Sequence, residues 1–261
     1  MKIFDCFKFF NEIELLDLRL HVLGDLVDYF ILVEANKTHT GKKKEFIFEH
    51  HKDKFKDYLD RIVYVKVEDL PDYSRDDIWL AENFQRNCIS RGLHAAKNGD
   101  KIIVSDIDEI PNPSTIRSVL DSNKPVTMYQ YLFYYYVNCI QNSLWFGSII
   151  ATYGQYDSPQ SLRNLARTEY NPLRPGGWHY SFMGGAERVR QKVESIAESH
   201  LIIDNVGSVE EIERKMVSQK DLWNRKDIYA QKRIIDITQP GLAPTCLNWF
   251  INKYPDFYFR G

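Results

Sequence analysis

The fold class is decided by one stretch of sequence, Lys101-Ile102-Ile103-Val104-Ser105-Asp106-Ile107-Asp108-Glu109-Ile110-Pro111. An apolar run ends there in two carboxylates one residue apart, and a proline follows soon after. This pattern predicts a buried parallel strand whose carboxyl end carries acid groups into a crevice, where open α/β sheets bind their ligands. Two carboxylates this close repel each other unless a cation lies between them, so we expect Mg²⁺ or Mn²⁺ holding a diphosphate.

Two other interpretations of Asp106 and Asp108 stay open. The first is an exposed strand end whose acids cap the helix that Pro113 and Ser114 begin. The second is a phosphohydrolase with an aspartate nucleophile, because such enzymes also place Asp-x-Asp after a buried strand. That class places the strand near the start of its core and follows it with Thr or Val, whereas Glu109 follows here. We therefore favour the metal site.

Strand and helix patterns alternate through the first half of the chain. Short apolar runs predict three further strands, at residues 3–7, 29–33 and 61–67. Helical spacing of apolar residues predicts two helices, at residues 12–23 and from Asp76 or Asp77 to Ala96. The alternation predicts an α/β fold with a doubly wound, mostly parallel, Rossmann-type central sheet flanked by helices.

The second half of the chain changes character. Long strands are predicted at residues 126–140 and 144–153, joined by a turn at 141–143. A Pro- and Gly-containing loop follows at residues 159–177. Beyond Ala186 the pattern is mostly helical, and Ser208 before Glu211 is typical of a capping box.

Length and charge limit the organisation and the partners. With 261 residues we expect a single domain, divided into a nucleotide-binding half (1–123), a half for acceptor and metal (124–200) and a helical tail (201–261). The net charge of −2 gives no electrostatic case for a nucleic-acid partner. Residues 1–7 are too soon interrupted by charge for a signal peptide, and no apolar run reaches membrane-spanning length. We expect a cytoplasmic protein without a membrane span, with Cys6, Cys88 and Cys139 as reduced core thiols.

A second cluster of interest lies at residues 176–185, where two glycine pairs flank Trp178 and His179. Glycines let a backbone approach a ligand closely, and a helix that begins after Gly184 and Gly185 favours a phosphate at its start. His179 could bind the same metal through a ring nitrogen, with Lys192 near the phosphate. The alternative is a pair of turns around a core tryptophan and a hydrogen-bonded histidine.

Two further segments offer candidate contacts. Arg86 and Asn87 could face a nucleotide from their helix, although Glu82 and Arg86 are also spaced for a surface ion pair. The aromatic run at residues 129–136, with Trp145 beyond it, could stack on sugar rings. The same run could equally be a core strand buried on both faces.

Taken together, these motifs resemble the family 17 glycosyltransferases, the group that includes the enzyme adding the bisecting N-acetylglucosamine to N-glycans. The likeness rests on an ordered set of segments that covers most of the chain up to about residue 200. These segments are residues 4–12, 27–35, 38–43, 82–87 with 91–93, 105–111 and 177–181.

The resemblance implies a GT-A fold, a UDP-sugar donor (UDP-N-acetylglucosamine), a divalent metal, a glycan acceptor and inversion at the anomeric carbon. Carried over by position, Asp106 and Asp108 would meet the metal and the ribose, and His179 would be a further metal ligand. Gly184 and Lys192 are expected at the donor as well.

Other positions are carried over in the same way. Glu34 and Asn36 would lie near the base and ribose, and Arg86 and Asn87 near the uridine or phosphates. The acceptor hydroxyl needs a carboxylate to take its proton. Glu187 is the first candidate for this base, and the others are Asp157, Glu169 and Glu109.

Two alternative functions stay open at this point. One is a catalytically silent glycan-binding protein that keeps the fold. The other is a sugar nucleotidyltransferase, a class that usually has a Gly-rich loop after its first strand. No glycine occurs between Asp5 and Asn11, which counts against the nucleotidyltransferase.

Overall fold

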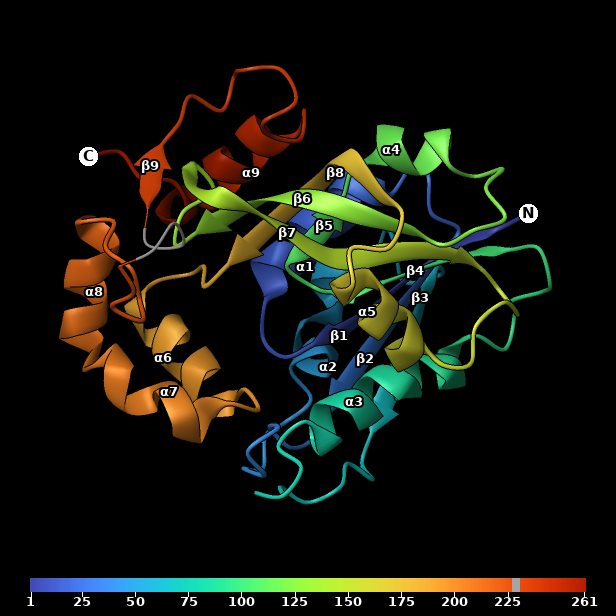
Figure 1. Ribbon diagram of the computed structural model, residues 1–261, viewed down its shortest axis with the longest axis horizontal. Helices are drawn as coiled ribbons and strands as arrows, with labels where there is room; N and C mark the ends of the chain where they lie inside the picture. The colour runs from blue at the N-terminus through green and yellow to red at the C-terminus, as the bar shows by residue number, and fades with distance from the viewer. Residues whose placement is uncertain (227–230) are drawn as a thin grey trace.

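The first half of the chain builds the parallel part of one sheet. The computed structural model describes residues 1–226 and 231–261 (Figure 1). The strands of this part are β1 (Ile3–Phe9), β2 (Tyr29–Ala35), β3 (Ile62–Val67) and β4 (Lys101–Asp106). They lie in the order β3-β2-β1-β4, and each neighbouring pair is parallel. The predicted alternation of strands and helices is confirmed here, and all four carboxyl ends meet at one edge.

The second half makes the sheet mixed, so the expectation of a mostly parallel sheet is wrong for the whole. Its strands are β5 (Glu109–Pro111), β6 (Val126–Tyr134), β7 (Cys139–Thr152), β8 (Pro172–Ser181) and β9 (Lys232–Ile234). Four strand pairings in the described part of the chain are parallel and four are antiparallel. The physical reason is that β6 and β7 form a hairpin, which can pair only antiparallel, and β7 then joins β4.

The hairpin turn lies earlier than the sequence predicts. The chain reverses at residues 135–138, and residues 141–143 lie inside β7. Tyr135 takes the left-handed conformation (φ 67°) at this reversal, a role more often filled by glycine. Asn138 is the one common turn residue within this reversal, so its sequence signal is weak.

Residues 159–177, expected to be a loop, are mostly regular structure. They hold α5 (Pro159–Arg167) and the first part of β8. Helix α5 begins with a capping box between Ser158 and Ser161, and Pro159 stands at its first turn, where its missing N–H costs nothing. The sequence predicts a loop that starts at Pro159, whereas in the structure Pro159 begins helix α5.

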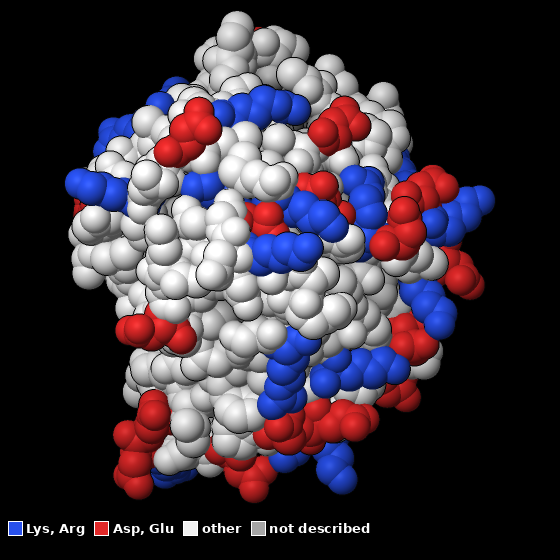
Figure 2. All heavy atoms as spheres, turned by 90° about the vertical axis from the view of Figure 1, so that its right-hand side faces the viewer, with Lys and Arg blue, Asp and Glu red and all other residues white. Residues whose placement is uncertain are grey.

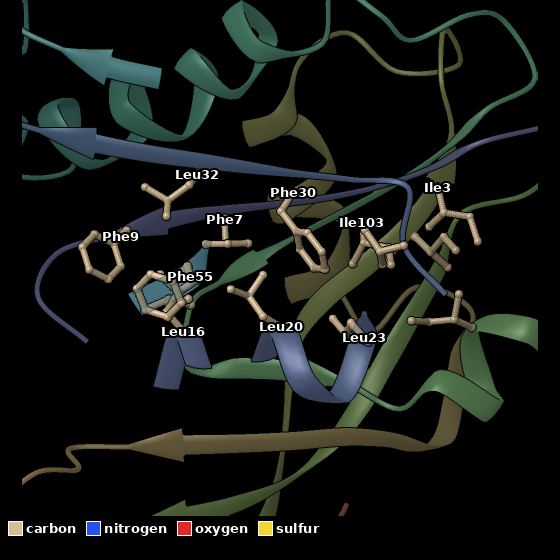
Figure 3. Close-up of a cluster of buried hydrophobic side chains, with 14 of the residues drawn as sticks. Ile3, Phe7, Phe9, Leu16, Leu20, Leu23, Phe30, Leu32, Phe55 and Ile103 are labelled. Atoms are coloured by element: carbon tan, nitrogen blue, oxygen red, sulfur yellow. The ribbon is translucent and has the colours of Figure 1, made fainter. Parts of the chain in front are cut away.

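One face of the parallel strands is covered by α1 (Ile13–Leu23), α2 (Ile47–His51) and the 3₁₀ turn η1 (Lys52–Phe55). The four apolar positions predicted for the first helix are all buried: Ile13, Leu16, Leu20 and Leu23. Figure 3 shows Leu16, Leu20 and Leu23 rising from α1 toward side chains of β1, β2 and β4. The predicted helical spacing is therefore confirmed.

The opposite face is covered by α5, α3 (Leu80–Asn87) and the 3₁₀ segment η2 (Cys88–Gly92). The predicted helix up to Ala96 is thus too long. A Cβ at Gly92 would lie 2.5 Å from Ile31 Cγ2 and 3.0 Å from Val65 Cγ2. The chain approaches β2 and β3 so closely there that the helix gives way to a tighter turn.

The predicted helical tail is helical only in part. Helices α6 (Ala186–Ser195), α7 (Ser199–Val206) and α8 (Val209–Val217) gather beside one end of the sheet (Figure 1). The capping box of Ser208 and Glu211 is confirmed at the start of α8. Strand β9 then pairs with β7, and α9 (Leu247–Lys253) packs in one apolar cluster with Leu15 and Leu18 of α1.

The remaining features concern the surface and the cysteines. On the face in Figure 2, basic and acidic side chains are interspersed. Within the described residues, no helix is both long and apolar enough to cross a membrane. Cys6, Cys88 and Cys139 are buried free thiols, as expected.

Candidate active site

A cavity of about 270 Å³ opens at the carboxyl edge of the parallel strands. Its lining comes from both halves of the sheet. Segments after β1, β2 and β4 form one side, and β6, β7, β8 and α6 form the other. The predicted site residues Asp106, Asp108, His179 and Lys192 all line this cavity.

Arg19 of α1 binds the backbone of the turn that carries Asp106 and Asp108. This fully buried guanidinium pairs with Asp5 of β1, with Nη2 2.6 Å from Oδ1. Its Nη1 donates to the carbonyl oxygens of Asp106 at 2.9 Å, Ile107 at 3.2 Å and Glu109 at 2.9 Å. Three carbonyls that converge on one planar donor group fix the backbone of the turn.

The first aspartate belongs to a buried ionic network, here named the Asp106 cluster. Its members are Lys8, Glu82, Arg86, Asp106, Glu109 and Arg163. Asp106 Oδ1 lies 3.1 Å from Arg86 Nη2 and 3.3 Å from Lys8 Nζ, and Oδ2 lies 3.0 Å from Arg163 Nη2. Burial raises the pKa of Asp106, but these three cations outweigh it and hold the pKa well below its usual range.

The second aspartate belongs to a smaller group, the Asp108 cluster, defined as Glu12, Asp108, His179 and Lys192. Lys192 Nζ lies 2.6 Å from Asp108 Oδ2 and 3.9 Å from Glu12 Oε1. His179 Nε2 lies 3.6 Å from the same Asp108 oxygen. Burial raises the pKa of Asp108, but Lys192 and His179 lower it further than burial raises it. Asp108 is therefore an ionised carboxylate at the cavity wall.

Repulsion between the carboxylates of Asp106 and Asp108 was the reason to expect a metal ion between them. The structure removes this reason. Each carboxylate is already neutralised by cations of the protein, Asp106 by arginines and a lysine and Asp108 by Lys192. Among residues 1–226 and 231–261, no three His, Cys, Asp or Glu side chains are grouped to hold a metal ion.

A smaller protein ligand set is nevertheless present. Mg²⁺ and Mn²⁺ sites often use only one or two protein ligands, with waters and substrate phosphates completing the shell. Asp108 Oδ2 and His179 Nε2 are near enough to bind one ion, and the buried His179 Nδ1 has no hydrogen-bond partner among the described residues. The residues thus fit a cation held by Asp108 and His179, in the position where Lys192 now neutralises Asp108.

Three of the other predicted donor contacts lie outside the cavity lining. Glu34 is fully buried and accepts hydrogen bonds from Lys44 Nζ at 2.6 Å and Tyr64 Oη at 2.8 Å. It therefore anchors Lys44, which does line the cavity. Asn36 has a buried Oδ1 without a hydrogen-bond partner in the part of the chain that the structure describes. Asn87 Oδ1 accepts a hydrogen bond of 3.0 Å from the Gln160 backbone N–H, which connects α3 to α5.

Arg86 lies beneath the cavity within the Asp106 cluster, where it is 2% exposed. Gly184 takes φ 90° just before α6 and lies outside the cavity lining, so its predicted contact with the donor stays a prediction. Glu187 is exposed on the first turn of α6 and does not line the cavity. Asp157 and Glu169 are also exposed outside the lining.

Glu109 does line the cavity, but Arg163 binds both of its oxygens, at 2.6 and 2.7 Å. Burial raises the pKa of Glu109, and Arg163 more than reverses this rise. A carboxylate held in this way is a weak base.

Sequence reasoning missed Arg163 and Arg19. Arg163 lies on α5, in a segment expected to be a loop, and the Ser158-Pro159 start of that helix was the available signal. Arg19 is a charged residue on the buried face of α1. A charge in the apolar stripe of a helix needs a buried partner, which Asp5 supplies.

Comparison with known proteins now adds to this geometry. The family model of glycosyltransferase family 17 matches residues 1–230, which include every residue of both clusters. The chain belongs to glycosyltransferase family 17. The match includes the parallel strands, the cavity and helices α6 to α8.

Curated relatives in this family carry the name beta-1,4-mannosyl-glycoprotein 4-beta-N-acetylglucosaminyltransferase. The human protein is 33% identical over 107 residues, which are 39% of this chain and 20% of that protein. The rat protein matches to the same extent, and the mouse protein is 32% identical over the same length. The aligned part of this chain thus spans about a fifth of the length of these relatives.

Proposed function

We propose that this family 17 member transfers a sugar, N-acetylglucosamine in the first instance, from a UDP-sugar to a hydroxyl group of a glycan. We further propose a GT-A type of donor site, a divalent cation and inversion at the anomeric carbon. One observation supports this most directly. The Asp108 carboxylate, His179 and Lys192 meet in a cavity at the carboxyl ends of parallel strands, in a chain of this family.

The reaction exchanges one C–O bond for another. The bond between the anomeric carbon and the β-phosphate oxygen breaks, and UDP leaves with the electron pair. The acceptor oxygen forms the new bond from the opposite side and loses its proton to a base. The negative charge that grows on the diphosphate is what the site must stabilise.

The chain's own residues meet this requirement in three ways. Lys192, which donates a hydrogen bond to Asp108, would bind a phosphate oxygen with its ammonium group. Asp108 and His179 would hold Mg²⁺ or Mn²⁺, which supplies Lewis-acid stabilisation of the leaving diphosphate when bound. Arg19 keeps the turn with both aspartates rigid, so little reorganisation accompanies the reaction.

The proposal is tested with the purified protein, a panel of nucleotides and sugar nucleotides, and Mn²⁺. We expect UDP to raise the unfolding temperature strongly only when Mn²⁺ is present, because a ligand that binds only the folded state stabilises it. UDP-N-acetylglucosamine and a glycan acceptor should then yield free UDP. Glycan binding without any response to UDP would instead indicate a silent glycan-binding protein, and release of pyrophosphate from UTP would indicate a nucleotidyltransferase.

A further inference from the structure

Trp145 lines the cavity and is connected to Arg163 through Glu109. Arg163 binds both carboxylate oxygens of Glu109, and Glu109 Oε1 accepts a hydrogen bond of 2.6 Å from the indole Nε1 of Trp145. Glu109 is 1% exposed and Arg163 3% exposed. The only donor atom of the indole is thereby held by a buried, ionised acceptor.

Gly147, two residues after Trp145 on β7, makes room for this arrangement. A Cβ at this position would overlap both Glu109 Oε1 and Trp145 Nε1. The Gly147 carbonyl also accepts a hydrogen bond from Arg163 Nη1. Glycine here is explained by close approach of side chains, since Gly147 does not have a positive φ.

Two further side chains contact the Trp145 ring. The ring centroid of His179 lies 4.7 Å from that of Trp145, with the rings tilted by 44°. The Arg167 guanidinium carbon lies 4.1 Å from the Trp145 centroid, as in a cation–π contact. Trp145 is therefore a fixed wall of the cavity, in contact with a proposed metal ligand.

The position of this wall indicates what lies against it. Nucleotides bind at the carboxyl ends of parallel strands, which here are the ends of β1, β2 and β4. The cavity continues from Asp108 to β6, β7 and β8, where Leu132, Tyr134 and Trp145 line it. With the nucleotide at the parallel end, the group beyond the diphosphate lies at this aromatic end.

We propose that Trp145 contacts the sugar of the donor, and that Glu109 and Arg163 are positioning residues that hold its indole ring. This inference rests on the proposed function, because it takes a UDP-sugar as the ligand. It gives Glu109 the role of an anchor instead of a catalytic base.

The test separates binding of the sugar from binding of the nucleotide. Calorimetry with Mn²⁺ measures the affinity of each variant for UDP and for UDP-N-acetylglucosamine. Trp145→Phe keeps an aromatic ring but loses the hydrogen bond to Glu109. We expect roughly tenfold weaker binding of UDP-N-acetylglucosamine, because the smaller ring is no longer fixed by Glu109 and the contact with the sugar loses its pre-organisation. Binding of UDP should stay within about twofold, since the nucleotide does not reach the indole.

Two further variants show whether the anchor acts through the ring. Glu109→Gln keeps an oxygen that can accept from the indole, so its loss of sugar-nucleotide affinity should be smaller than that of Glu109→Leu. In the Trp145→Phe background, Glu109→Gln should add little, because the hydrogen bond is already absent. Trp79→Phe, at an exposed tryptophan outside the cavity lining, is the matched control and should change neither affinity.

The outcomes are distinct. Equal losses for UDP and UDP-N-acetylglucosamine in Trp145→Phe would mean a general structural role and would overturn the inference. Unchanged affinity for both ligands would also overturn it while the proposed function stands. If the unsubstituted protein bound neither ligand, the proposed function would fail and this inference with it.

Discussion

The Asp106 and Asp108 clusters lie on one short turn, yet they are built in different ways. Asp106 receives Lys8 from β1, Arg86 from α3 and Arg163 from α5, all parts of the frame around the sheet. Asp108 receives His179 from β8 and Lys192 from α6.

This difference separates two tasks, stability and ligand binding, within one Asp-x-Asp motif. Arginines remain charged at any pH the folded protein meets, so the Asp106 cluster is permanently compensated. A lysine and a histidine can exchange one partner for another, so the Asp108 cluster can accept a cation or a phosphate. The comparison predicts that damage to the first cluster lowers stability and damage to the second lowers activity.

The largest expected effect tests the first half of that statement. Arg163→Met removes the cation that binds Glu109 twice and Asp106 once, and it leaves buried carboxylates short of a partner. We expect the free energy of unfolding, measured in urea, to fall by about 3–5 kcal/mol. Arg117→Met, at an exposed arginine of α4 (Pro113–Ser118), is the control and should change stability by no more than about 0.5 kcal/mol. Equal stability of the two variants would contradict a structural Asp106 cluster.

The second prediction addresses Asp108. Asp108→Asn removes the charge that Lys192 and His179 share, and sugar transfer should fall at least ~100-fold, as when a key electrostatic stabiliser is lost. Stability should change much less than in Arg163→Met. Initial rates of UDP release check the activity, with the exposed Asp204→Asn as the control that keeps full rate. Transfer near the unsubstituted rate with Mn²⁺ in excess would refute the assigned role of Asp108.

The parallel half of the fold was predictable because its signals are local. Apolar runs such as residues 29–33 form β2, and the apolar spacing in residues 12–23 forms α1. The antiparallel half was less predictable, because Asn138 is the one common turn residue in its hairpin reversal, and α5 begins with a proline. Local patterns did not indicate which strands would be neighbours across the mixed sheet.

The same distinction applies to the candidate site. Asp106, Asp108 and His179 stand in motifs that the sequence displays, and the structure places all three at one cavity. Their partners are distant in the chain: Arg163 follows Asp106 by 57 residues and Lys192 follows Asp108 by 84. Long-range ion pairs depend on topology, so a motif can indicate the carboxylates without indicating what neutralises them.

A third prediction tests whether Lys192 of the Asp108 cluster can exchange its carboxylate partner for a phosphate. Lys192→Met should weaken the binding of UDP roughly tenfold, because one charge-assisted hydrogen bond to phosphate is lost. Lys192→Arg keeps the charge and should recover part of this affinity. Calorimetry with UDP and Mn²⁺ measures both variants. If Lys192→Met bound UDP as tightly as the unsubstituted protein, the lysine would serve Asp108 alone, and the two clusters would be more alike than we infer.

The smallest expected effect concerns His39, which joins the Asp106 cluster to the cavity wall. Its Nε2 lies 2.8 Å from Gln85 Oε1, and its Nδ1 lies 3.8 Å from Glu82 Oε2. Burial lowers the pKa of His39 below its ordinary value of 6.5, in spite of Glu82. As the pH falls through that ordinary value, the unfolded chain takes up a proton that the folded protein resists. The stability contributed by neutral His39 is therefore present above this pH and decreases below it.

The unfolding free energy should accordingly decrease more in the unsubstituted protein than in His39→Gln when the pH falls from about 7.5 to about 5.5. Urea unfolding at each pH measures the difference. His94→Gln, at an exposed histidine, is the matched control and should keep the pH profile of the unsubstituted protein. Arginines stay charged throughout this range, so the effect isolates His39 as one titrating neighbour of the Asp106 cluster. An identical decrease in His39→Gln and the unsubstituted protein would show that His39 is not held neutral in the folded state.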